Sequence, residues 1–212
     1  MIRGHPSNVE EFDVYAICCN ALNVLVSAFH LVQQRTRTEA ATLMRVALEA
    51  AAAALPISRD PEARSRYLAG PFQSTKAISF ATKLVPMVGE LWGAMSNVAV
   101  HANVFGFGPQ VKDSAGDLSM SVEINLGARK QEKWQDEMNI ATLCLVSNVV
   151  LKLMLLTRGD LVHWPRTIVG IDRRFLADVD VRIIHYQNVI TSIIDRARRG
   201  GTVSASAASE TV

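Results

Sequence analysis

The sequence predicts a mainly α fold, a bundle of about five helices with one β-hairpin inserted after the third long helix. Apolar residues recur at helical spacing along most of the chain, whereas residues 118–126 alternate apolar and polar side chains like a half-buried strand. Of the 212 residues, 49% are hydrophobic but only 6% are aromatic. A chain rich in Ala, Leu and Val favours packed helices over a β-sandwich.

The first two long helices follow each other almost directly. The first begins after Pro6 and continues to about Gln34. The second has Thr38 as its cap and is expected to stop before Pro56, because a proline disfavours helical backbone at the residue preceding it. The run of alanines at residues 50–54 lets another backbone approach closely.

A short helix and a third long helix come next. The short helix covers residues 60–69, with Asp60 as its cap and Pro61 at its first position. The long helix covers residues 74–102, and Pro86 is expected to kink or split it because proline removes a backbone donor.

After the third long helix, the spacing of apolar residues changes from helical to alternating. In "LSMSVEINL", residues 118–126, apolar and polar side chains alternate strictly, and "NVFGFGPQV", residues 103–111, supplies the neighbouring strand. We therefore expect a β-hairpin over residues 103–126.

Two further helices, over residues 129–157 and 172–199, complete a single domain spanning residues 1–200. The remaining segment, residues 201–212, is small and polar without apolar periodicity, and we expect it to be a disordered tail.

Charge and cysteine content exclude several classes of site. The net charge of +2 does not predict nucleic-acid binding. The three cysteines lie in apolar helical runs and resemble small buried hydrophobes in a reducing compartment. The sequence has no cysteine and histidine spacing typical of zinc and no phosphate-binding glycine loop. We expect neither a metal nor a cofactor.

Two stretches, residues 15–32 and 140–156, are long and apolar. Each is short for a membrane span and contains polar residues, so we expect buried bundle helices in a cytoplasmic protein without membrane contact. Because both helices are so apolar, part of their surface is expected to be buried in a homodimer.

One stripe of the first helix is polar and uncharged. Its five members recur at offsets of 3 and 4, which places them on one face: Asn20, Asn23, Ser27, His30 and Gln34. The stripe is either a solvent-exposed face or a polar seam that lines a pocket, since a solvated face more often carries Lys and Glu.

Arg45 and Glu49 stand four residues apart in the second helix, so they can pair. One interpretation is a structural ion pair within the helix. The other is that Arg45 faces a cleft and binds a phosphate or carboxylate.

Glu90, Asn97 and His101 share one face of the third long helix. A carboxylate, an amide and an imidazole can form a general base with its orienting partners. The alternative is a structural histidine that bonds the last carbonyls of its helix.

A family resemblance rests on two short motifs, "MRVALEA", with an arginine and a glutamate four apart, and "SNVAVHAN", with a serine followed by a histidine and an asparagine. Over residues 39–126 the chain resembles bacterial α-helical proteins of unknown function that are similar to HEPN-type domains. Such bundles are common in toxin–antitoxin, abortive-infection and other defence systems.

The resemblance implies a non-catalytic binding protein that contacts a partner protein or RNA. Its expected site comprises Arg45, Glu49, Asn97, Asn23 and His30. The alternative is a metal-independent ribonuclease with His101 as general acid or base, as in active HEPN enzymes. Those enzymes carry an arginine shortly before the histidine, and residues 94–96 contain none, so the sequence favours a protein that is not an enzyme.

A small-molecule-binding bundle is the second alternative. It would be recognised by one deep internal pocket with apolar walls and a few convergent polar groups.

Overall fold

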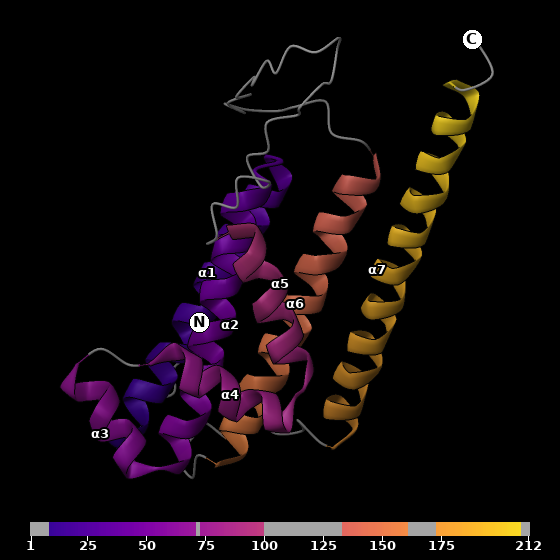
Figure 1. The fold of residues 1–212 in the computed structure, drawn as a ribbon. Coiled ribbons are helices and arrows are strands. Elements are labelled where there is room, and N and C mark those ends of the chain that lie inside the picture. The colour runs from indigo at the N-terminus through magenta and orange to yellow at the C-terminus, as the bar shows by residue number, and fades with distance from the viewer. Residues whose placement is uncertain (1–8, 71–72, 100–132, 161–172, 209–212) are drawn as a thin grey trace.

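The computed structural model describes residues 9–70, 73–99, 133–160 and 173–208 (Figure 1). Within these ranges the chain consists of helices joined by short turns, and the long helices run side by side. The helices are α1 (Val9–Gln33), α2 (Arg37–Arg59), α3 (Pro61–Ala69), α4 (Ser74–Leu84), α5 (Met87–Ala99), α6 (Lys133–Asp160) and α7 (Arg173–Ala208).

This architecture corrects the predicted fold class. The described residues form seven helices and no strand, instead of about five helices with an inserted hairpin. The predicted hairpin, residues 103–126, lies outside the described residues. At the other end of the chain, α7 continues to Ala208, past the predicted end of the last helix near Arg199.

The helix count differs from the prediction partly because Pro86 splits the third long helix. The α4 helix ends with Val85 N–H donating to the Ala81 carbonyl, and α5 starts after Pro86, whose carbonyl accepts from Gly89. By contrast, Pro56 lies inside α2, and the prediction that the helix stops before it is wrong. In the last turn a proline leaves few bonds to lose, and the Pro56 carbonyl still accepts from Asp60 N–H at 3.0 Å.

Two helix boundaries rest on clear local chemistry. Asp60 caps α3 as predicted, its Oδ1 accepting a 2.9 Å hydrogen bond from Glu62 N–H, with Pro61 at the first helical position. Between α1 and α2, Arg35 adopts a φ of 62°, while Thr36 N–H donates to Leu31 and Arg35 N–H donates to Val32. This Schellman turn reverses the chain sharply, so α2 returns along α1.

The central helix of the bundle is α2, which packs against α1, α3, α4, α5 and α6. Its buried positions are dominated by alanine, the residue with the highest helix propensity and the smallest apolar side chain. Small side chains let neighbouring helices approach closely on several sides of α2. The alanines that are buried here are Ala40, Ala41, Ala47, Ala51, Ala52, Ala53 and Ala54.

The outer helices attach through packing and a few ion pairs. Arg64 of α3 binds Asp13 of α1 at 3.0 Å, and Arg35 binds Asp136 of α6 at 3.1 Å. The α7 helix packs on α6, where Lys152 pairs with Asp180.

Three of the described helices are long and apolar enough to cross a membrane: Glu11–Gln33, Arg37–Arg59 and Trp134–Gly159. The predicted cytoplasmic location is therefore wrong, because this length and composition point to a membrane protein. The prediction considered only residues 15–32 and 140–156, whereas the helices that could cross a membrane are 23 to 26 residues long. In α2, 61% of the most apolar segment is buried inside the bundle, whereas in α1 only 28% of the most apolar segment is buried.

A substitution of Leu48 tests the central position of α2. Leu48 is fully buried, so Leu48→Ala is expected to lower the free energy of unfolding by about 2–5 kcal/mol through lost burial and a residual cavity. The measurement is urea unfolding followed by circular dichroism. Val46, on the same helix but 40% exposed, is the matched control, and Val46→Ala should change stability by less than about 1 kcal/mol. Equal effects of the two substitutions would contradict the assignment.

Candidate functional site

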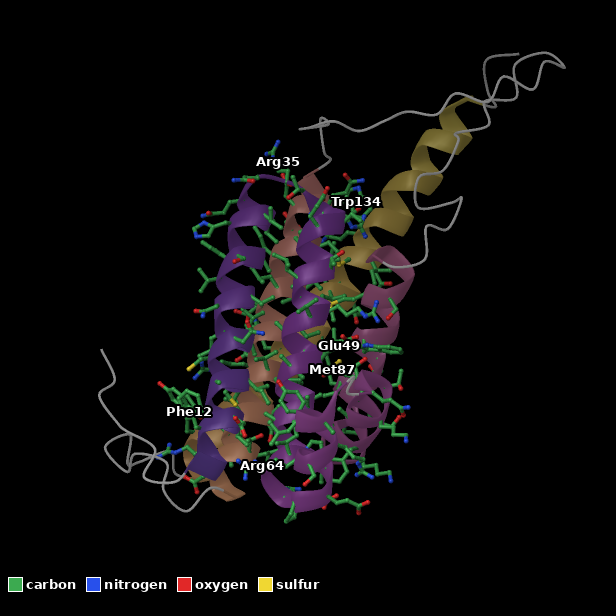
Figure 2. The ribbon with its side chains drawn as sticks, turned by 90° about the vertical axis from the view of Figure 1, so that its left-hand side faces the viewer. Phe12, Arg35, Glu49, Arg64, Met87 and Trp134 are labelled. Carbon is green, nitrogen blue, oxygen red and sulfur yellow. The ribbon has the colours of Figure 1, made fainter. Side chains whose placement is uncertain are left out.

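Arg45, Glu49 and Trp92 form a polar cluster between α2 and α5. The Arg45 Nε atom donates a 2.9 Å hydrogen bond to Glu49 Oε1, and the same oxygen accepts a 2.7 Å bond from the indole Nε1 of Trp92. The Arg45 guanidinium carbon lies 5.1 Å from the centre of the Trp92 ring. Glu49 lies on the side of α2 that faces α5 (Figure 2). Each of the three side chains thus contacts the other two.

This geometry supports the structural interpretation of Arg45. The Arg45 and Glu49 side chains are only 19% and 22% exposed, so an unpaired charge here would be costly. The carboxylate balances the guanidinium, and the face of the indole ring adds a cation–π contact. The cluster also joins α2 to α5, because Trp92 is the partner contributed by α5.

The structure describes only part of the predicted group of Glu90, Asn97 and His101. The backbone of Asn97 is part of α5, but its side chain is not described. His101 lies outside the described residues. Glu90 is exposed on α5. Ser96 is 7% exposed and donates a 2.7 Å hydrogen bond to the Trp92 carbonyl within its own helix.

Asn23 and His30 are not brought to Arg45 and Glu49. The whole polar stripe of α1 is exposed to solvent, and Figure 2 shows α1 and α5 on opposite sides of α2. Of the two interpretations of this stripe, the geometry supports an outer face rather than the lining of a pocket. The expected binding site that combines these residues is therefore not assembled within one chain.

The structure contains a cavity of about 400 Å³ on a different face of α5. It lies among α2, α5, α6 and α7, at a place where α5 and α7 both flank the central helices but do not form a packed interface with each other. Its walls are mainly apolar and contain four methionines. The apolar lining includes Met44, Met87, Met95, Met138, Leu91, Leu145 and Ile190.

A few polar groups point into this cavity. The Asn139 side chain of α6 is only 8% exposed and makes no hydrogen bond with any other described residue. Thr142, one turn further, also lines the wall. From α7, the Gln187 amide nitrogen lies 3.9 Å from the Met87 sulfur, a weak contact across the cavity.

Arg37 and Glu90 are the two charged residues in the lining. Both are exposed, so they stand at the mouth and not in the interior. The interior is consequently apolar with uncharged hydrogen-bonding groups.

A second hollow, of about 470 Å³, lies between α3 and α4. Its polar lining consists largely of exposed charged side chains, among them Arg59, Arg66 and Lys76, and Arg66 is 3.6 Å from Asp60. Water satisfies such groups, so this hollow lacks the buried polar group that distinguishes the cavity beside α5.

Sequence reasoning missed Asn139 as a site residue. The signal was present, because Asn139 and Thr142 lie three residues apart just where α6 becomes strongly apolar. An asparagine at that spacing is equally typical of a solvated helix face. Only the packing of α2, α5 and α7 around it identifies it as buried.

No group of three or more His, Cys, Asp or Glu side chains that could hold a metal ion occurs among the described residues. The three cysteines, Cys18, Cys19 and Cys144, are all free. Comparisons of the chain with protein families, with curated proteins and with solved structures find no match.

Removal of the Glu49 carboxylate tests the cluster. Glu49→Leu leaves Arg45 largely buried without its carboxylate and Trp92 without an acceptor, so we expect a loss of about 1–3 kcal/mol in the free energy of unfolding. The double variant Arg45→Met/Glu49→Leu should lose less than the single variant, because no charge is then left unpaired. Strictly additive losses in a double-mutant cycle would contradict the pairing.

Proposed function

We propose that this protein binds a small molecule with an apolar body and one uncharged hydrogen-bonding group, in the cavity among α2, α5, α6 and α7. The observation that carries the proposal is the mainly apolar cavity whose lining includes Asn139, a residue that is only 8% exposed and whose side chain makes no hydrogen bond with another described residue. A hydrogen bond between a ligand and this amide contributes about 0.5–1.5 kcal/mol. A ligand that makes this bond gains an affinity that a purely apolar molecule lacks.

The size and the lining of the cavity support the same ligand class. A volume of about 400 Å³ falls within the range of about 300–1,000 Å³ that is usual for small-molecule sites. Four methionines contribute flexible, polarisable side chains, which adapt to differently shaped apolar surfaces. We therefore expect the site to select for apolar shape and one hydrogen bond.

The charges at the mouth do not favour an ionic ligand. Arg37 and Glu90 have opposite signs and both are exposed to water. No charged side chain lines the interior of the cavity in the part of the chain that the structure describes. A charged head group buried beside Asn139 would remain without a counterion, which is costly.

The interaction and ribonuclease functions implied by the HEPN resemblance stay predictions. The ribonuclease needs His101, which lies outside the described residues, and a cation for phosphate, for which Arg45 was the candidate. Arg45 already pairs with Glu49 and contacts Trp92. Its charge is thus balanced within the fold, and the cavity is the feature that the geometry supports best.

Binding of N-phenyl-1-naphthylamine tests the proposal. This neutral probe has an aromatic body and one N–H group, and its fluorescence rises when it leaves water. We expect the purified full chain to bind it at one site, and Ala94→Trp, which fills the cavity from its rim, to weaken binding at least tenfold. Ala177 is also exposed but does not line the cavity, so Ala177→Trp should bind the probe like the wild type. Unchanged binding by Ala94→Trp, or no binding at all, would contradict the proposal.

Asn139→Leu separates the hydrogen bond from the apolar contacts. We expect this variant to bind N-phenyl-1-naphthylamine about tenfold more weakly, the equivalent of one lost hydrogen bond of about 1.4 kcal/mol. Competition with 1-benzylnaphthalene, which has CH₂ in place of N–H, should be unaffected or improved. Equal losses for both molecules would show that Asn139 acts only through packing.

A further inference from the structure

The outer face of α1 carries a row of apolar side chains that the bundle leaves uncovered. Phe12, Leu22, Val26 and Phe29 are between 44% and 57% exposed. Tyr15 and Cys19 lie in the same row and are half-buried. We call these six residues, Phe12, Tyr15, Cys19, Leu22, Val26 and Phe29, the outer seam.

The outer seam has the spacing of a coiled coil. Its residues follow one another at offsets of 3, 4, 3, 4 and 3, so they occupy successive a and d positions. A separate inner row of α1 supplies the packing against the bundle. The buried members of that row are Val14, Ile17, Cys18, Ala21, Leu25 and Ala28.

The bundle therefore uses only one of the two apolar rows of α1. Residues 14–34 contain no Asp, Glu, Lys or Arg, so no charged side chain of this segment interrupts the outer seam. An exposed apolar row of this length marks a surface that is covered by something else.

We propose that the outer seam pairs antiparallel with the outer seam of a second copy of this chain. Antiparallel seams pack an a position against a d position, and this register matches every member of the row. Phe12 of one copy meets Phe29 of the other, Tyr15 meets Val26, and Cys19 meets Leu22. The two-fold axis passes between residues 20 and 21, and the contact is self-complementary, as a two-fold interface requires.

The helix dipoles favour the antiparallel direction. Asp13 near the start of α1 and Arg35 after its end already pair with Arg64 and Asp136 of the same chain, so these two charges do not decide the direction. Antiparallel pairing opposes the dipoles of the two α1 helices. Parallel pairing would align them.

Lipid is the other apolar surface that can cover such a row. The uncharged polar residues beside the seam, Asn20, Asn23, Ser27 and His30, are exposed. In hydrocarbon they would lose their water partners, whereas at the rim of a helix pair they keep water or bond across the interface. The heptad spacing and these neighbours favour a helix of a second copy.

Sedimentation velocity of the full chain in a mild nonionic detergent, which is needed because three helices are long and apolar enough to cross a membrane, tests the proposal. We expect a dimer for the wild type and at least a tenfold rise in the dimer dissociation constant for Val26→Glu. The matched control is Ile184→Glu on α7, because Ile184 and Val26 are both 57% exposed. The control should remain dimeric. A monomeric wild type, or a Val26→Glu variant as dimeric as the wild type, would overturn the proposal.

Two further experiments determine the direction in which the two α1 helices pair and show whether lipid or protein covers the outer seam. With copper phenanthroline as oxidant, Leu22→Cys should form a covalent dimer with the native Cys19 of the other copy, while Ser27→Cys, which lies off the seam, should not. A wild-type dimer cross-linked through Cys19 alone would indicate parallel pairing and contradict this register. A wild-type monomer that floats with phosphatidylcholine vesicles, and no longer does so as Val26→Glu, would assign the seam to lipid.

Discussion

Burial of α2 is the constraint on which the rest of the structure depends. A helix packed against five others can lie at close range only where its side chains are small, and its alanines meet this requirement. The same crowding limits what can reach α2 directly: α7 packs on α6 and stands one layer further out. The cavity lies where α7 and α5 fail to close over the central helices.

The two polar features of the bundle have opposite characters. At the α2–α5 contact, the Glu49 carboxylate accepts bonds from both Arg45 and Trp92, so every strong charge there has a partner. Across α5, the Asn139 amide has none. A fully paired cluster holds helices in place, whereas an unpaired amide in an apolar cavity is available to a ligand.

Local features of the fold could be predicted where a few neighbouring residues decide them. The Asp60 cap and the helix break at Pro86 depend on one residue and its immediate backbone. Pro56 shows the limit, because a proline in the last turn of α2 is tolerated when the rest of the helix is held by its neighbours. The helices that are long enough to cross a membrane also extend beyond the apolar stretches seen in the sequence, residues 15–32 and 140–156.

The candidate site could be predicted only in part. The spacing of Arg45 and Glu49 indicates their pairing, but the Trp92 partner depends on how α5 lies against α2. Periodicity likewise groups Asn23 and His30 on one face without saying whether that face is covered. Asn139 was missed because its burial is produced by the packing of three other helices, α2, α5 and α7, around it.

The most direct test of the account is an NMR titration with ¹³C-methyl-labelled methionine and N-phenyl-1-naphthylamine. Four of the seven methionines, Met44, Met87, Met95 and Met138, line the cavity, whereas Met154 is half-buried elsewhere on α6. If the probe binds in the cavity, it shifts the methyl signals of those four methionines and leaves that of Met154 unchanged. Binding of the probe without shifts at these four methyl groups would contradict binding in the cavity.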